Sequence, residues 1–218
     1  MKRALIAALA TSLPTLAPHA AGIPLYPTGP AEDSAFVRFV NATDAALEIQ
    51  AAGSQAKLSL PTDKPSSGFM PVAANKPVKG TLTGADRRSD VAVTVKPGEF
   101  ATVIALAKNA SLVIKESPDD FNAMRASLAF YNADPACRQA GLRAAGRNVG
   151  IFDGVGHGQA KRRLINPVAV TVELTCGGKP QGSPRELGAL EAGQRYTVLA
   201  VPGPQGTRTL FANDALIR

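Results

Sequence analysis

Few residues of this 218-residue chain have side chains suited to catalysis. Of its two histidines, His19 lies in an N-terminal segment with the features of a signal peptide, so an exported chain would keep His157 alone. A serine-histidine-aspartate site would have to use His157, yet this residue lies in a glycine-rich stretch and no nucleophile-elbow motif is present. Two of the 17 acidic residues could still converge as in a glycosidase, but the acids lie beside turns, where solvated acids are common. We therefore predict a protein without catalytic residues that is not an enzyme.

The two cysteines, Cys137 and Cys176, predict a disulfide in the second half of the chain. In an exported protein a pair of cysteines is expected to be oxidised. Closing a loop of about 40 residues would stabilise the fold by roughly 4 kcal/mol through the entropy of the unfolded chain. A metal site would need more ligands than these cysteines and one histidine supply. We therefore expect neither a metal nor a cofactor.

Basic residues are concentrated in the second half of the chain. Residues 22–120 hold 10 basic and 11 acidic residues, net −1, whereas residues 121–218 hold 12 and 6, net +6. A basic surface would suit a polyanion such as an acidic polysaccharide, or an acidic protein. Alternatively, these side chains lie on strand edges and discourage edge-to-edge pairing. Nucleic acid is not an expected partner, because no aromatic residues interleave with the basic ones. The candidate contact residues are Lys161, Arg162, Arg163, Arg138, Arg143 and Arg147.

Residues 1–21 have the three parts of a secretory signal peptide. A short positive head precedes the apolar run Ala4–Leu13, which is too short to span a bilayer, and small residues suit cleavage after Ala20 or Ala21. We therefore expect the chain to be exported to the periplasm.

An arm follows the predicted signal peptide. Its sequence IPLYPTGP, Ile23–Pro30, holds three prolines, which remove hydrogen-bond donors and force extended backbone on their neighbours. Its Leu25-Tyr26 pair would either pack onto the adjacent domain or bind a partner.

The chain repeats itself after about ninety residues. AFVRFVNATD at Ala35–Asp44 recurs as SLAFYNADP at Ser127–Pro135, with the two asparagines 91 residues apart. A near-constant offset predicts two copies of one domain. Two further pairs of segments recur in the same order, at offsets of 90 and 95 residues: Pro77-Val78 with Pro167-Val168, and Val95–Leu106 with Leu190–Val201.

Each copy reads as a β-sandwich. Short runs rich in valine, isoleucine, threonine and leucine alternate with turn signals about every ten residues, which favours a sandwich over a barrel. The charge of Arg38 within an apolar strand indicates one buried face and one solvent-exposed face. The glycine-rich segment Asn148–Gly158 lacks the strand and helix of a phosphate-binding loop and reads as a flexible connection. The predicted divisions are a signal peptide (1–21), an arm (22–34), a first sandwich (35–114), a linker (115–123) and a second sandwich (124–218).

Several segments in order give the chain a resemblance to a known family. It resembles the AlgF family of periplasmic alginate O-acetylation accessory proteins, and the resemblance covers nearly the whole mature chain. This sequence departs from the family pattern in its cysteine pair, its glycine-rich insertion and the basic Lys161-Arg162-Arg163. Related systems acetylate other polymers such as cellulose. The sequence therefore does not decide whether the polymer is alginate. The segments that carry the resemblance are LYPTGP, SAFVRFVNAT, Phe69-Met70-Pro71, the acidic linker, LINPVAVTVEL and LEAGQRYTVLAV.

The resemblance implies two sandwiches similar to carbohydrate-binding modules and no catalytic activity. It also implies an adaptor that links a membrane-bound O-acetyltransferase to periplasmic SGNH-type acetyltransferases. The alternative is a carbohydrate-binding module that holds an acidic polysaccharide through the basic second domain. Sugar-binding surfaces usually carry exposed aromatic rings, so the exposure of the aromatic residues distinguishes the two hypotheses.

Overall fold

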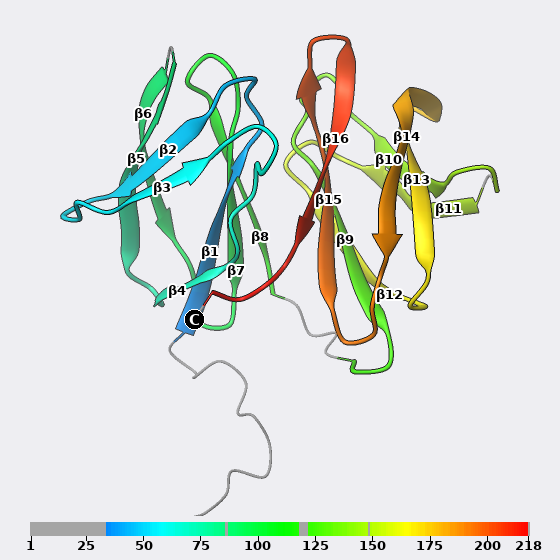
Figure 1. Cartoon of the computed structure of the whole chain (residues 1–218), viewed down its shortest axis with the longest axis horizontal. Coiled ribbons are helices and arrows are strands. Elements are labelled where there is room, and N and C mark those ends of the chain that lie inside the picture. The colour runs from blue at the N-terminus through cyan, green and yellow to red at the C-terminus, as the bar shows by residue number, and fades with distance from the viewer. Residues whose placement is uncertain (1–33, 86, 118–121, 148, 218) are drawn as a thin grey trace, which may run out of the picture.

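The computed structural model describes residues 34–85, 87–117, 122–147 and 149–217. The predicted signal peptide and the arm up to residue 33 lie outside the described residues, as does part of the predicted linker. All regular elements of the described part are β-strands, and they form two sandwiches side by side (Figure 1). Among the described residues there is no helix long and apolar enough to cross a membrane. The predicted all-β class is therefore confirmed.

The first sandwich contains strands β1 (Ser34–Asn41), β2 (Leu47–Ala51), β3 (Lys57–Leu60), β4 (Met70–Ala73), β5 (Pro77–Gly84), β6 (Arg87–Thr94), β7 (Phe100–Ala105) and β8 (Ser111–Glu116). One of its sheets has the order β4-β1-β7-β8 and the other has the order β3-β2-β5-β6. Strand β1 runs parallel to β7, and the other neighbours are antiparallel.

The second sandwich contains β9 (Ala126–Asn132), β10 (Ala140–Ala144), β11 (Val149–Val155), β12 (Ala160–Ile165), β13 (Ala169–Cys176), β14 (Lys179–Ala189), β15 (Arg195–Gly203) and β16 (Gly206–Asn213). Its sheets have the orders β12-β9-β15-β16 and β11-β10-β13-β14. Every strand thus takes the position of the strand eight places earlier, including the parallel pair of β9 with β15. The two halves share one topology, as the sequence repeat predicts.

A buried asparagine closes the same turn in both sandwiches. Asn41 donates through Nδ2 to the carbonyl of Ala45 at 2.7 Å and to that of the last residue of β3 at 2.9 Å. Asn132 likewise donates to the carbonyl of Cys137 at 2.6 Å and to that of the last residue of β11 at 2.9 Å. Buried polar groups need such partners, which explains why the Asn-Ala pair is the part of the repeat most easily recognised.

Each sandwich encloses its own apolar core between its two sheets. Alternate residues of β1, such as Val37 and Phe39, point into the first core, and those of β9, such as Leu128 and Phe130, point into the second. The second core also contains the expected disulfide, which joins Cys137 to Cys176 with Cα atoms 5.4 Å apart. The covalent link ties the turn before β10 to the end of its partner β13.

Three strands were not expected from the sequence, and a fourth, β11, occupies most of Asn148–Gly158, where a flexible connection was expected. Strand β4 contains Pro71, which a sheet tolerates at an edge because no donor is needed there. Strand β8 continues to Glu116, within the segment predicted as a linker. Strand β12 carries three consecutive basic residues, which hide its alternation of inward-facing and outward-facing side chains. Each is an edge strand, and a strand with only one neighbour carries a weaker apolar pattern.

The end of the chain returns to the first sandwich (Figure 1). Phe69, just before β4, donates its N–H to the carbonyl of Ala215 at 2.8 Å and accepts the N–H of Ile217 at 2.8 Å. Residues 215–217 thus form a strap beside Phe69. Gly68 leaves room for the strap, because a Cβ at Gly68 would lie 2.7 Å from a side-chain carbon of Ile217. The strap thus pairs with the residue just before the edge strand β4, and Pro71 removes a donor from that strand, which discourages pairing with other strands.

We predict that Asn41→Ala and Asn132→Ala each lower the free energy of unfolding by about 2 kcal/mol, because each leaves buried carbonyls without donors. Urea denaturation measures the change. Asn213→Ala, at an exposed position of β16, serves as the control and should change stability by less than about 0.5 kcal/mol. Equal stability of all three variants would contradict the structural role of the buried pair.

Candidate functional site

The two sandwiches meet through one sheet of each. The sheet β4-β1-β7-β8 faces the sheet β12-β9-β15-β16, and apolar side chains from both form a third buried cluster (Figure 1). Arg208 of β16 adds a polar contact by donating to the carbonyl of Ala42 at 3.1 Å. The cluster consists of Val40, Ala42, Ile104, Ile114, Ala129, Tyr131, Ala133, Leu199, Val201 and Leu210.

Asp214 lies at the centre of a charged network beside this cluster. Its carboxylate accepts hydrogen bonds from Arg38 Nη1 at 2.5 Å, from Arg162 Nη2 at 2.7 Å and from Thr197 Oγ1 at 2.7 Å. Arg38 belongs to the first sandwich, whereas the other three residues belong to the second. Asp214 therefore receives one guanidinium from each sandwich.

Arg162 also reaches across to the first sandwich. Its Nε and Nη2 donate to the two carboxylate oxygens of Glu116 at 3.0 and 2.6 Å, and its Nη1 donates to Ser127 Oγ at 3.1 Å. Such two-point contact between a guanidinium and a carboxylate is stronger and more directional than a contact through one atom. Arg162 thus joins β12 to β8 as well as to Asp214.

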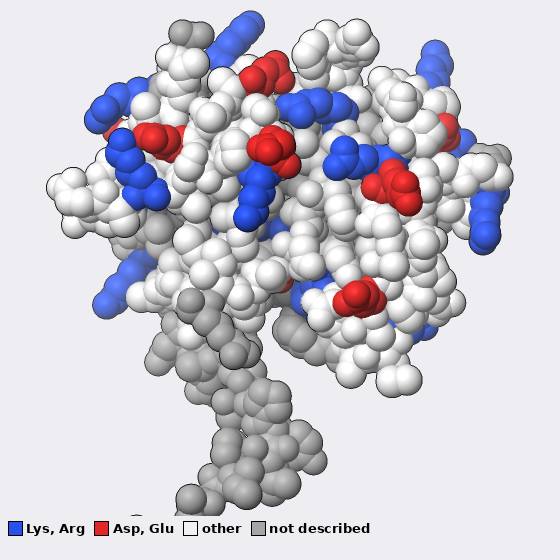
Figure 2. Space-filling view, viewed as in Figure 1, with Lys and Arg blue, Asp and Glu red and all other residues white. Residues whose placement is uncertain are grey.

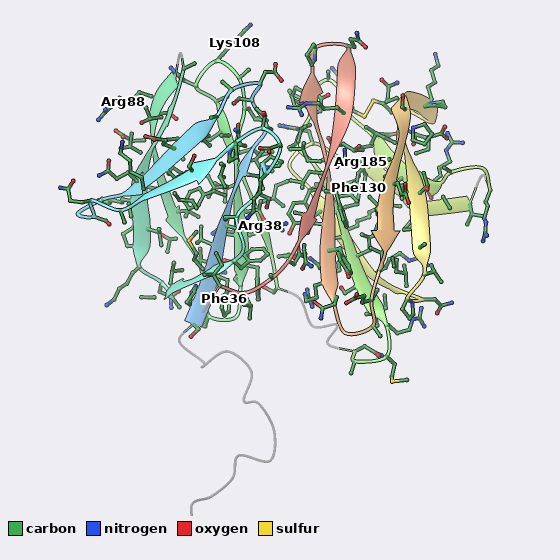
Figure 3. All side chains as sticks on the ribbon, in the orientation of Figure 1. Phe36, Arg38, Arg88, Lys108, Phe130 and Arg185 are labelled. Atoms are coloured by element: carbon green, nitrogen blue, oxygen red, sulfur yellow. A yellow bond between two sulfur atoms is a disulfide. The ribbon has the colours of Figure 1, made fainter. Side chains whose placement is uncertain are left out.

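Arg38 is fully buried, although the sequence pattern placed it on a solvent-exposed face. In Figure 3 it points from β1 toward the second sandwich. Its Nε donates to Thr102 Oγ1 at 2.9 Å, and its guanidinium carbon lies 4.5 Å from the centre of the Phe69 ring and 5.7 Å from that of Tyr131. The outer face of β1 is therefore covered by the second sandwich. The apolar and polar pattern of one strand cannot reveal such a covering domain.

The network is charged at neutral pH. Burial disfavours the ionised carboxylate of Asp214, but the positive charges of Arg38 and Arg162 outweigh burial and hold its pKa below its ordinary value. Burial also disfavours the charged form of Arg162, but the hydrogen bond and negative charge of Glu116 raise its pKa above its ordinary value. Burial raises the pKa of Tyr131, so this phenol stays neutral.

The predicted basic contact residues divide between the interface and the surface of the second sandwich. Successive strand residues point to opposite faces, and on β12 this separates Arg162, in the network, from its exposed neighbours Lys161 and Arg163. Lys161 donates to the carbonyl of Asp153 at 2.7 Å and Arg163 donates to that of Ile151 at 3.0 Å. These two side chains cap the edge of β11, as the edge-protection alternative describes.

The other three candidates lie around β10. Arg143 on this strand donates to the carbonyl of Gly178 at 2.9 Å, and its Nε lies 3.8 Å from Oε2 of Glu173. Arg138 and Arg147 are exposed at opposite ends of the strand. On the face of the molecule shown in Figure 2, basic and acidic side chains are interspersed. Arg162 is thus largely buried in the interface, whereas the other five candidates lie on the strands and turns around β10, β11 and β12.

His157 lies exposed in the turn between β11 and β12. Among the hydrogen bonds found in the described part of the chain, none involves its imidazole, and the described residues contain no cluster of potential metal ligands. Apart from Arg162, which was expected at a surface, the residues of the interdomain network were missed in the sequence. Arg38 was the one signal, since a charge inside an apolar strand needs either solvent or a buried partner.

Comparison with known proteins places the chain in a family. It matches the family model described as alginate O-acetyl transferase AlgF over residues 8–197, and it belongs to this family. Membership implies a role in alginate O-acetylation, in which AlgF is an exported periplasmic accessory protein. No curated protein matches the chain.

Three solved structures show a partial similarity to the chain. The C-terminal domain of AlgF from P. aeruginosa is 19% identical, with 41% of this chain and 98% of that chain covered and a TM-score of 0.37. A CBM26 module from Eubacterium rectale Amy13K in complex with maltoheptaose is 10% identical, with 84% and 97% covered and a TM-score of 0.28. A putative cell adhesion protein from Bacteroides uniformis is 10% identical, with 85% and 98% covered and a TM-score of 0.30. At these identities and TM-scores, nothing about this chain is argued from the three structures.

We predict that Asp214→Asn lowers the free energy of unfolding at neutral pH by about 3 kcal/mol or more, because two buried guanidinium groups lose their shared charge partner. A carboxyl with a depressed pKa stabilises the fold above its unfolded pKa of about 3.9, and this contribution disappears as the pH falls through the folded pKa. The difference between unaltered and variant protein should therefore shrink below about pH 4.

Urea denaturation of both proteins between neutral pH and pH 3 measures this difference. Asp90→Asn, which removes an exposed carboxylate bonded to Thr81, is the matched control and should behave like the unaltered chain. A stability difference for Asp214→Asn that stays constant across the acid range would contradict the assignment.

Proposed function

We propose that the chain is a non-catalytic adaptor that holds acetyltransferase components together during O-acetylation of an exported polysaccharide, which family membership indicates is alginate or a related polymer. Its partners are a membrane-bound O-acetyltransferase and periplasmic SGNH-type acetyltransferases. Export follows cleavage of the signal peptide near Ala20 or Ala21.

The observation that carries this proposal is the buried interface between the sandwiches. An apolar cluster and the Asp214 network fix one sandwich against the other, so the outer surfaces of both keep a constant relative position. Domains joined by a flexible linker alone would change orientation freely. A rigid pair of β-sandwiches suits a protein that places two enzymes at a set distance.

The alternative, a carbohydrate-binding module, is less well supported because the rings are hidden. Among the described residues the phenylalanines and tyrosines are buried or partly buried. In the second sandwich Phe130 and Tyr131 are completely buried, Phe152 and Tyr196 nearly so, and Phe211 packs against the core. Sugar binding by ring stacking would require exposed faces, so we favour protein partners over polymer.

A three-component binding experiment tests the adaptor. The SGNH-type acetyltransferase is immobilised, and retention of the detergent-solubilised membrane acetyltransferase is measured with and without this chain. We expect retention only when the chain is present, and several-fold less retention with Asp214→Asn, whose sandwiches are held less firmly. Asp90→Asn should retain as much as the unaltered chain. Retention that does not depend on the chain, or binding to neither enzyme, would refute the adaptor.

Titration with alginate oligosaccharides at low and high salt tests the alternative. Binding driven by basic side chains should weaken as salt rises, because salt screens exposed charges. We expect no salt-sensitive binding to the unaltered chain. The double variant Lys161→Glu with Arg163→Glu should therefore give the same result as the unaltered chain. Tight, salt-sensitive binding that this double variant removes would favour the polymer-binding module instead.

A further inference from the structure

The first sandwich contains an apolar cleft beside its edge strands β3 and β4. The cleft measures about 390 Å³ and opens between the two sheets, which places it within the usual volume range of ligand pockets. Its lining is mostly aliphatic, and several of the lining side chains are only partly buried. The main lining residues are Val37, Phe39, Leu58, Met70, Val72 and Val78.

The second sandwich fills the equivalent space with an aromatic ring. Strand pairing places Leu58 of β3 and Phe152 of β11 at equivalent positions in the two copies. Phe152 is nearly buried, and its ring stacks on that of Phe130 with the ring centres 5.9 Å apart. The first sandwich has Phe39 at the position of Phe130, but the smaller Leu58 replaces the second ring.

A long cation closes the edge of the second sandwich, and the first sandwich lacks its counterpart. Arg163 on β12 donates to the carbonyl of Ile151 on β11 at 3.0 Å. The equivalent residue is Met70 on β4, because Arg163 pairs with Leu128 and Met70 pairs with Val37, 91 residues earlier. A thioether cannot donate such a hydrogen bond. Since the copies share one topology, the cleft results from side-chain differences at these positions.

The lining selects a class of ligand. Aliphatic side chains offer few hydrogen-bonding groups, so a sugar would lose its hydration without replacement. A slot between two sheets suits an unbranched acyl chain, which gains free energy with every methylene group that leaves water. A water molecule takes about 30 Å³ in the liquid and a methylene group a similar volume, so the cleft holds a chain of about ten carbons. The flexible side chain of Met70 can adapt to its contour.

Two lysines at the cleft indicate the charge of the ligand. Lys57 and Lys79 are exposed lining residues, and Lys57 is paired with Glu48 at 2.9 Å. Lys79 can lay its carbon stem along the apolar lining and keep its ammonium group in water. We propose that the cleft binds a free fatty acid of medium length, with the acyl chain between the sheets and the carboxylate beside Lys79. This inference goes beyond the adaptor function and does not depend on it.

Isothermal titration calorimetry of the exported chain with decanoate tests this site. We expect one saturable site per chain, with octanoate binding roughly tenfold more weakly because it buries two fewer methylene groups. Butanoate, which carries the same charge on a short chain, should show no binding. Decanoate that binds no more tightly than butanoate would overturn the proposal.

Two variants assign the binding to the cleft. Leu58→Phe introduces the ring of the second sandwich and should weaken decanoate binding at least tenfold, whereas Ala85→Phe, exposed at a second pocket, should leave it unchanged. Ala56→Phe fills the cleft mouth from an exposed position and replaces Leu58→Phe if thermal unfolding shows that Leu58→Phe is not folded. Unchanged binding by the folded variant would overturn the proposal.

Charge reversal tests the acidic head of the ligand. Lys79→Glu should weaken decanoate binding several-fold and leave decanol binding unchanged. Lys108→Glu is the matched control, because Lys108 is an exposed lysine of the second pocket, at the top of the first sandwich in Figure 3, and its reversal should change neither. Decanoate binding that Lys79→Glu leaves unchanged would contradict the acidic head.

A second copy of the chain and a lipid bilayer are the other occupants to be tested. Sedimentation velocity measures self-association, and flotation with phosphatidylglycerol vesicles measures binding to a bilayer. We expect neither. Self-association or vesicle binding that Leu58→Phe abolishes would overturn the free fatty acid as the ligand. None of these readouts involves the acetyltransferases, so their failure is distinguishable from failure of the adaptor.

Discussion

The carboxylate of Asp214 is bound by a guanidinium from each sandwich, and the relative position of the two domains depends on this contact. A buried charge without a partner is costly. Arg38 depends on the second sandwich for its carboxylate, whereas Asp214 would keep Arg162 but lose one of its two guanidinium partners without the first. The strap that follows Asp214 then pairs with Phe69 at the edge of the first sandwich. Charge, apolar cluster and strap thus all act at the same boundary, and together they make one unit of two similar halves.

The two copies have diverged where they face each other and have stayed alike where they face their own cores. Asn41 and Asn132 make equivalent hydrogen bonds in the two turns. At the offset of 91 residues, however, buried Arg38 corresponds to Ala129, whose small side chain lies in the shared cluster. At this position the first copy therefore supplies a guanidinium and the second copy a small side chain. This asymmetry explains how tandem copies form one specific interface.

The fold was largely predictable from the sequence, but the site was not. Internal strands carry the repeat and the apolar alternation, so the all-β class and the paired sandwiches follow from local patterns. The edge strands β4, β8 and β12 do not, because proline or consecutive charges obscure them. Arg162 was interpreted as part of a surface patch because its neighbours are basic, whereas the alternation of side chains along the strand turns it inward. Asp214 has no sequence signal at all. Contacts between residues 38, 162 and 214 depend on how the two sandwiches meet, which no single segment encodes.

A fixed pair of sandwiches is the property on which the proposed adaptor depends. Differential scanning calorimetry of the exported chain tests it most directly, because a buried interface couples the unfolding of the two domains. The account predicts a single transition whose calorimetric and van't Hoff enthalpies agree. Two separate transitions, one for each sandwich, would show that the domains unfold independently and would contradict it.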